Sequence, residues 1–392
     1  MSDPPGTLCG RAGAHLGRTT KRGRSVRLLL FSDLHLDTSF GWAGPDLARV
    51  RRQALRDTLR RITALASAER VDALLCGGDL YEHERFSPDT AQFLQSTFAE
   101  LDLPVYLAPG NHDWYGPASL YRQVEWSPNV HVFTEDHLVP IEVADGVTLW
   151  GAAHRAPANT DGFLAGGFTV GRGGVNLGLF HGSEVAALGF QESGKDPHAP
   201  FSTQEIDSSG LDHVFLGHFH TPRDADRHTY PGNPDPLTFG EAGERSAVLF
   251  TVDGDGSVTR DRRRVAVSEV HDCDVNLDGV THCGQIRERV AAAVAGLAGV
   301  VRVTLAGDVA PDVDVHLGDL AGVAPHLEAL VPRLGRVGVS YDVTTLAQER
   351  TVRGQFVRDA QASADLDDDT RRRVLVTGLR ALEGRIDELE VH

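Results

Sequence analysis

The sequence has few cysteines, few lysines and no long apolar run. Its four cysteines form no C-x-x-C pair and are too few for a disulfide framework in 392 residues, so we expect reduced, mostly buried thiols. No segment approaches the roughly 18 apolar residues of a membrane span, and residues 1–24 lack the apolar stretch of a signal peptide. These absences predict a soluble, cytoplasmic protein without a membrane partner.

Acidic residues outnumber basic ones, and nearly all of the basic residues are arginine. The only lysines are Lys21 and Lys195, and the net charge is −17. Nucleic-acid-binding surfaces depend on clustered lysine and arginine, so this balance argues against a protein coated with such a surface. It leaves room for a local basic groove or for bound cations that attract phosphate themselves.

Short runs rich in valine and leucine recur from Val26 onward and end in Gly, Asp, Asn or His. They predict a large α/β domain at residues 25–267, after a disordered basic tail at residues 1–24. The predicted strands are Val26–Ser32, Val71–Gly77, Pro104–Ala108, Val147–Ala152, Val175–Phe180, Leu211–Leu216, Ala247–Val252 and Val258–Val267.

A helix is predicted between the first two strands, because Leu55, Leu59, Ile62 and Ala66 fall on one helical face. Its arginines lie largely elsewhere, and a solvated face explains them better than a phosphate-contacting face. These residues are Arg51, Arg52, Arg56, Arg60 and Arg61.

A smaller α/β domain is predicted at residues 268–392, where the polar strand ends give way to a regular alternation of strands and helices. After a first strand we expect a helix, a strand, a helix, a strand and two helical stretches. Their predicted ranges are Gln285–Leu297, Val300–Leu305, Leu320–Leu334, Val337–Val343, Leu346–Ala360 and Asp368–Glu388.

Five segments carry metal-ligating side chains, and four of them directly follow a predicted strand. The carboxyl ends of strands in an α/β sheet are where ligands gather, so these segments are expected to converge. Carboxylate, imidazole and amide donors suit Mn²⁺, Fe²⁺ or Zn²⁺. A shared carboxylate can hold two such ions and make hydroxide from a bridging water. The segments are Asp33-Leu34-His35, Gly78-Asp79, Gly110-Asn111-His112-Asp113, His181-Gly182 and Gly217-His218-Phe219-His220.

This set resembles the calcineurin-like metallophosphoesterase superfamily across about residues 26–265. The resemblance implies a sandwich of two sheets flanked by helices and a site for two divalent cations. It implies that Asp33, His35, Asp79 and His220 hold the first ion and that Asp79, Asn111, His181 and His218 hold the second. His112 would instead contact the phosphate and assist the leaving oxygen.

Within that superfamily, residues 230–241 and the C-terminal domain resemble the SbcD type of DNA-repair exonuclease, and a related YhaO-like group fits equally well. The resemblance implies a Mn²⁺-dependent exonuclease, with single-strand endonuclease activity in some members, that works on DNA with an SbcC-type coiled-coil ATPase. The C-terminal domain would be a capping or DNA-binding accessory. Whether the chain is a monomer or a homodimer stays open.

Glu82 departs from the SbcD pattern, which often has Asp at this place. It could accept a hydrogen bond from His112 and fix the tautomer of that ring. His83, Trp114 and Tyr115 are candidate substrate contacts, with an ordinary loop histidine and rim packing as the alternatives. Arg52, Arg56 and Arg60 are candidate DNA-backbone contacts.

Two other functions compete with the nuclease. One is a phosphodiesterase or phosphatase for small molecules or phosphoproteins, although the D-R-G continuation of phosphoprotein phosphatases is missing after Asp79. The other is a weakly active scaffold subunit of an ATPase complex.

Overall fold

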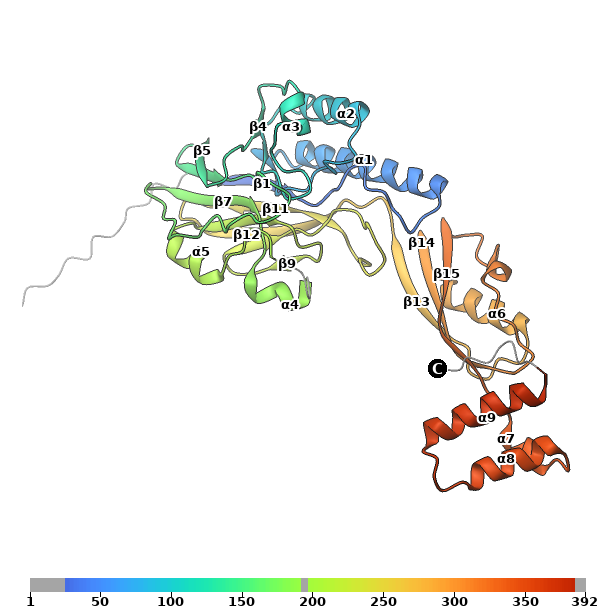
Figure 1. The fold of residues 1–392 in the computed structure, drawn as a ribbon. Helices are drawn as coiled ribbons and strands as arrows, with labels where there is room; N and C mark the ends of the chain where they lie inside the picture. Colours follow the sequence, from blue (N-terminus) through green and yellow to red (C-terminus); the bar gives the residue numbers. More distant parts are fainter. Residues whose placement is uncertain (1–24, 192–196, 385–392) are drawn as a thin grey trace, which may run out of the picture. The chain divides into compact units, whose positions relative to one another are not determined.

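The computed structural model describes residues 25–191 and 197–384 as two compact units (Figure 1). The first unit comprises the described parts of residues 1–41, 48–235 and 244–267, and the second comprises residues 42–47, 236–243 and the described part of 268–392. The predicted tail and the predicted helix end at Glu388 lie outside the described residues. None of the described helices is long and apolar enough to cross a membrane.

The first sheet has the strand order β12-β11-β1-β2-β3-β4. β1 to β4 run parallel, whereas β11 pairs antiparallel with β1 and β12 pairs antiparallel with β11. The strands are β1 (Val26–Phe31), β2 (Ala73–Cys76), β3 (Val105–Leu107), β4 (Val130–Val132), β11 (Ser246–Val252) and β12 (Val258–Arg264).

The second sheet has the order β5-β6-β7-β8-β10-β9, with the four inner strands parallel and both edge strands antiparallel to their neighbours. The strands are β5 (Val139–Ala144), β6 (Val147–Gly151), β7 (Val175–His181), β8 (His213–Gly217), β9 (Arg223–Asp224) and β10 (His228–Tyr230).

The two sheets pack face to face around one apolar core. Leu30 and Leu75 of the first sheet share this core with Leu177 and Phe215 of the second. Helices lie on the outer sides of both sheets (Figure 1), which confirms the predicted two-sheet α/β fold. They are α1 (Pro45–Ala68), α2 (Pro88–Ala99), α3 (Leu120–Gln123), the short η1 (Val185–Ala187), α4 (Leu188–Gln191) and α5 (Thr203–Ser209).

Helix α1 buries the apolar face that the sequence predicts, since Leu55, Leu59, Ile62 and Ala66 are fully buried. The prediction that Arg51 belongs to a solvated face is wrong. Its side chain is also fully buried and its guanidinium pairs with Asp235 at 3.4 Å. A partner 184 residues away leaves no local trace in the sequence.

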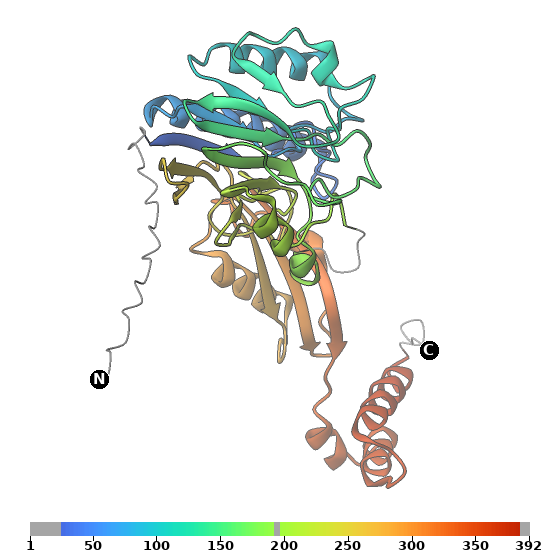
Figure 2. The same cartoon turned by 90° about the vertical axis from the view of Figure 1, so that its left-hand side faces the viewer.

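The second unit contains a parallel three-stranded sheet with the order β13-β14-β15. Its helix α6 contributes Val290 to an apolar cluster that also contains Leu305. The C-terminal α8 and α9 pack side by side, as the red helices in Figure 2 show. The elements are β13 (Val270–Asn276), α6 (Cys283–Val294), β14 (Val300–Val309), the short η2 (Leu317–Leu320), β15 (Ala329–Val339), α7 (Val343–Gln348), α8 (Val352–Ala362) and α9 (Asp368–Leu382).

The helix predicted at Leu320–Leu334 is wrong, because residues 321–328 form turns and β15 begins at Ala329. Pro332 lies inside this strand and would break a helix interior, and β15 is an edge strand, where proline is tolerated. The strand predicted at Val337–Val343 overlaps only the end of β15. The thiols are less buried than predicted, since Cys283 is exposed at the start of α6.

Candidate metal centre

The seven predicted metal ligands lie together at the carboxyl ends of five strands. β1 leads to Asp33 and His35, β2 to Asp79, β3 to Asn111, β7 ends at His181, and β8 leads to His218 and His220. The structure contains three sets of three residues in which the potential metal-ligating atoms lie within 4.8 Å of one another, and some residues belong to two sets. They are Asp33, His35 and His220; His35, Asp79 and His112; and Asp79, His181 and His218.

Asp79 lies between two groups of imidazoles. Its Oδ2 is 3.6 Å from Nε2 of His35 and 3.2 Å from Nε2 of His181. On one side Nε2 of His35 faces Nε2 of His220 at 3.2 Å, and on the other Nε2 of His181 faces Nδ1 of His218 at 3.2 Å. The carboxylate therefore has the position of a ligand shared by two ions.

The donor atoms fit divalent cations. Nδ1 of His181 lies 2.9 Å from the Gly77 carbonyl and donates its proton there, so Nε2 presents a lone pair. That lone pair faces Oδ2 of Asp79 and, at 3.0 Å, Oδ1 of Asn111. Converging acceptors repel one another unless a positive charge lies among them. The donor set is one that Mn²⁺, Fe²⁺ and Zn²⁺ accept.

The electrostatic field of the site favours positive charge. Burial alone would lower the pKa of His181, but the negative charge of Asp79 and its hydrogen bond raise that pKa to about 9. The field that stabilises a proton on this imidazole equally stabilises a metal cation near it.

The ligand-bearing backbone is strained. Asp33, His35, Asp79 and His218 all have positive φ, at 57°, 50°, 51° and 109°. A residue with a side chain loses about 1–3 kcal/mol in such a conformation, and such strain concentrates at functional sites. The backbone therefore aims these side chains at a cost that the surrounding hydrogen bonds must offset.

Those hydrogen bonds join the loops after β1 and β2. The amide of Asp33 donates to the Gly78 carbonyl, and the amide of His35 donates to the Asp79 carbonyl, both at 2.9 Å. The loop after β8 is attached as well, because the amide of His218 donates to the Asp33 carboxylate at 3.0 Å.

Asp113 is a positioning residue that the sequence analysis did not assign. Its buried carboxylate accepts hydrogen bonds from the amides of Asp79, Leu80 and Gly110, at 3.1, 2.7 and 2.6 Å. The Tyr121 hydroxyl also donates to it, at 2.5 Å. One side chain thus ties the loop after β2 to the loop after β3. Its place at the end of G-N-H-D was the available signal.

Gly110 allows these two loops to approach closely. A Cβ atom at this position would lie 2.3 Å from Oδ1 of Asp79, which is closer than any real contact. The same oxygen accepts the amide proton of His112 at 2.8 Å. The glycine of G-N-H-D is therefore part of the geometry that places the shared carboxylate.

Glu82 connects the metal ligands to His112. One carboxylate oxygen lies 2.8 Å from Nδ1 of His35 and the other lies 3.0 Å from Nδ1 of His112. Burial would raise the pKa of Glu82, but these hydrogen bonds lower it to about 2, so it accepts from both rings. The predicted contact with His112 is present, and the link to His35 is new. Both histidines thereby present Nε2 away from Glu82.

His83 and Trp114 lie beside this centre, with ring centroids 4.5 Å apart. Both line a pocket that also contains His112 and Glu82. Tyr115 does not line that pocket. Its ring lies instead under the guanidinium groups of Arg122 and Arg155, at 6.0 and 5.4 Å.

The predicted DNA-contacting arginines of α1 do not join the site by any contact in the described part of the chain. Arg56 pairs with Asp89 at 2.5 Å, and Arg60 pairs with Asp57 at 2.6 Å. Both guanidinium groups also lie over the ring of Phe93. Arg52 is half-buried. Their DNA role stays a prediction.

Asn233 and Arg245 support the loop that carries His220. Arg245 donates both to the carbonyl of His220, at 2.6 Å, and to the side-chain oxygen of Asn233, at 2.7 Å. The amide of Asn233 donates to the same carbonyl at 3.3 Å. The Pro-Gly-Asn-Pro sequence at residues 231–234 therefore holds the loop that carries a candidate ligand.

Comparisons with known proteins agree with this chemistry. Residues 26–222 match the family described as calcineurin-like phosphoesterase. The YhaO protein of Bacillus subtilis (strain 168), named as an uncharacterized metallophosphoesterase, is 29% identical over 238 residues. That match covers 56% of this chain and 56% of the relative, so the chain spans about half the length of this curated relative.

Similar solved structures are more distant. A dimetal phosphatase from Danio rerio is 13% identical and matches 60% of this chain and 98% of its own, with a TM-score of 0.35. The TT1561 protein of Thermus thermophilus is 15% identical and matches 61% of this chain and 99% of its own, also with a TM-score of 0.35. Similarity at this level does not bear on substrate or residue roles.

Proposed function

The chain belongs to the calcineurin-like phosphoesterase family, and on that premise we propose that it is a Mn²⁺-dependent DNA exonuclease. The general activity is that of a metal-dependent phosphoester hydrolase with a dimetal-type site of Asp and His residues. The proposal adds the native metal, the DNA substrate and, as a second activity, cleavage of single strands.

We assign one ion to Asp33, His35, Asp79 and His220 and the other to Asp79, Asn111, His181 and His218. Two bound cations would polarise the phosphate oxygens and lower the pKa of a water held between them. The chain contributes the fixed positions of the donors, since His181 and His35 each use Nδ1 for a hydrogen bond and keep Nε2 for the metal.

His112 is proposed to donate a proton to the leaving oxygen. Burial would lower its pKa, but the hydrogen bond to Glu82 and the charge of Asp79 raise that pKa to about 9. Nδ1 is occupied by Glu82, so Nε2 is the ring nitrogen that is available to donate a proton.

The proposal of a large phosphodiester substrate rests on the exposure of His112. Its side chain keeps 48% of its surface exposed, beside ligands such as Asp33 and His181 that are fully buried. The reacting phosphate is thus approached from an open surface, which leaves room for the chain of a nucleic acid on either side of the phosphate.

The proposed setting is DNA repair in the cytoplasm, with DNA and an SbcC-type ATPase as partners and residues 268–392 as an accessory domain. These assignments rest on the resemblance of residues 230–241 and of the C-terminal region to that branch. The acidic net charge means that DNA contact must be local.

The decisive assay is degradation of linear double-stranded and single-stranded DNA by the two-metal protein, with Mn²⁺, alone and with its ATPase. We expect Mn²⁺-dependent shortening from ends that disappears with chelator. A generic chromogenic diester serves as the control for an intact metal centre. If the protein hydrolyses that diester and leaves all DNA intact, the nuclease proposal is wrong and a small-molecule phosphoesterase is favoured. If it hydrolyses neither, the scaffold alternative is favoured.

A further inference from the structure

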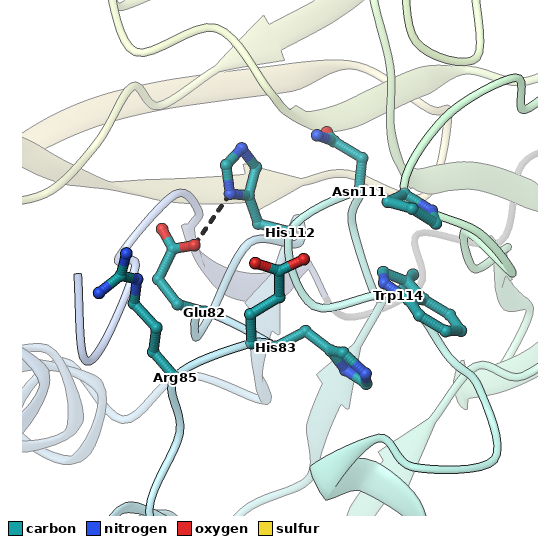
Figure 3. A pocket seen from close by; sticks show the side chains of 8 residues that line it. Glu82, His83, Arg85, Asn111, His112 and Trp114 are labelled. Carbon is teal, nitrogen blue, oxygen red and sulfur yellow. Dashed lines mark hydrogen bonds and ion pairs between the residues drawn. The ribbon is translucent and has the colours of Figure 1, made fainter. Parts of the chain in front are cut away.

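A pocket of about 280 Å³ lies next to the candidate metal centre (Figure 3). It is formed by the loops after β2 and β3 and by one residue of the loop after β6. The lining includes Asn111 and His112, so the pocket borders both a candidate metal ligand and the proposed proton donor. The other lining residues are Glu82, His83, Glu84, Arg85, Trp114 and Pro157.

One wall of the pocket is aromatic. The rings of His83 and Trp114 lie 4.5 Å apart between centroids and are inclined by 33°, close to a stacked arrangement. Burial lowers the pKa of His83, which disfavours the charged form of its ring. A nucleobase can bind such a pair by stacking on an outer face of one of the two rings, and stacking of this kind has no sequence preference.

The two rings of the aromatic wall are held in place by a backbone hydrogen bond to His112 and by packing against Gly116. The amide of His83 donates to the carbonyl of His112 at 3.0 Å. Trp114 lies against Gly116, where a Cβ atom would come within 1.9 Å of Cζ3 of the indole. Gly116 therefore leaves the space that the tryptophan ring occupies, and the wall is built into the loop that carries Asn111.

Charge and size limit what the pocket can hold. The carboxylates of Glu82 and Glu84 are balanced by Arg85 and the imidazole of His112, so the lining has no excess positive charge to attract a second phosphate. The volume lies just below the roughly 300–1,000 Å³ of pockets for drug-sized ligands, which suits one base better than several.

We propose that this pocket binds the nucleobase adjacent to the scissile phosphate, stacked on the wall formed by His83 and Trp114. The identification of the ligand as part of DNA rests on the proposed nuclease function. The preference for a flat ring attached to a phosphate is a property of the pocket itself and can be tested without DNA.

The test compares two inhibitors of small-diester hydrolysis by the Mn²⁺-loaded protein. Thymidine monophosphate and deoxyribose phosphate, each as the 5′- and the 3′-phosphate, present the same phosphate to the metals and differ only in the base. For at least one isomer, we expect the nucleotide to inhibit about 5- to 150-fold more strongly, the range that base stacking on an aromatic side chain gives. Quenching of tryptophan fluorescence by the nucleotide gives a second readout.

Variants locate the effect. The measured quantity is the inhibitor ratio, the factor by which the nucleotide inhibits more strongly than deoxyribose phosphate. Trp114→Ala should bring this ratio close to one, and Trp114→Phe should keep most of it. Gly116→Ala should lower it by displacing the indole. His83→Ala should lower the ratio, whereas His137→Ala, an exposed histidine that does not line the pocket, should leave it unchanged. A merely structural role of Trp114 would weaken both inhibitors equally and leave the ratio unaltered.

The proposal is overturned if the wild-type ratio is near one for both isomers, or if Trp114→Ala leaves it unchanged. Failure of the nuclease proposal gives a different result, namely intact DNA with the inhibitor ratio preserved. In that case the pocket serves a free nucleotide or a small nucleotide diester. If DNA is degraded, an abasic residue next to the cleaved phosphate should slow cleavage in the wild type more than in Trp114→Ala.

Discussion

The two units place polar residues at the carboxyl ends of parallel strands, yet among the residues that the structure describes only those of the first unit form a candidate metal centre. In the second unit, Asn276 ends β13, and Asp308 is the penultimate residue of β14. The amide of Asp308 donates to Asp278 at 2.7 Å, the amide of Asp278 donates to Asn276 at 2.8 Å, and Arg372 pairs with Asp308. The carboxylates of Asp278 and Asp308 thus already have a hydrogen-bond donor or a cation as partner. In the first unit, the potential metal-ligating atoms of Asp79, His181 and His218 face one another instead.

Backbone strain separates the two regions in the same way. All non-glycine residues with positive φ in the described ranges belong to the first unit, and four of them are candidate ligands. The comparison teaches that carboxylates at strand ends are not sufficient. The candidate metal centre is marked by imidazoles that converge on one shared carboxylate and by backbone held away from its relaxed conformation.

The largest contrast is expected between Asp79→Asn and Asp308→Asn. The first removes the charge shared by both ions, so metal content measured by mass spectrometry and diester hydrolysis should both fall. The loss should exceed the 10–100-fold that accompanies loss of a hydrogen-bond partner of a ligand. Asp308→Asn should change neither quantity. Equal metal loss in the two variants would remove the distinction between the units.

Within the first unit, His112→Ala should separate chemistry from metal binding. We expect hydrolysis to slow by about 10²–10⁴-fold, the usual contribution of a general acid, while both metals stay bound. The exposed His137→Ala is the matched control and should behave as wild type. Metal loss in His112→Ala would show that this ring is a ligand.

Glu82→Gln should lower both metal affinity and the rate of hydrolysis, each by less than Asp79→Asn does. The amide keeps the shape of the side chain but removes the negative charge that accepts protons from His35 and His112. Loss of such a hydrogen-bond partner typically costs 10–100-fold in metal affinity or activity. Metal titration and kcat measurements on one preparation test this. Retention of both properties at wild-type level would mean that Glu82 does not orient these rings.

The smallest effect concerns a histidine of the fold rather than of the site. Burial and the charge of Arg260 lower the pKa of His213 from 6.5 to about 3. Between these values the unfolded chain binds a proton that the folded chain does not, so the free energy of unfolding falls as the pH drops. The contribution is at most ~1.4 kcal/mol per pH unit.

His213→Asn should therefore lose less stability than the wild type between about pH 7 and about pH 5 in urea unfolding. An identical loss in both proteins would mean that His213 is protonated in the folded state. The metal content of the variant should stay at the wild-type level, since His213 is not among the candidate ligands.

The sequence predicts the elements that depend on local pattern. The buried runs of β1 and β7 and the apolar face of α1 are visible as valine- and leucine-rich segments, and the ligands follow from their place after those runs. The sequence around β15 predicts a helix because its hydrophobic residues suit either structure, whereas Pro332 favours an edge strand.

The sequence does not reveal side-chain contacts between residues that lie far apart along the chain. Glu82 reaches His35 from 47 residues away, and Arg51 finds Asp235 across 184 residues. The positive φ of Asp33 and Asp79 is also invisible, because neither is glycine and the strain is imposed by hydrogen bonds between loops. Such features appear only when the fold brings the loops together.

The most direct test of the dimetal centre is anomalous diffraction at the manganese edge from crystals grown with Mn²⁺. We predict two peaks about 3.5–4 Å apart, the usual separation in two-metal sites, with the Asp79 carboxylate between them. His35 and His220 should contact one peak, and His181 and His218 the other. A single peak, or peaks bound by Asp278 and Asp308 of the second unit, would contradict the account.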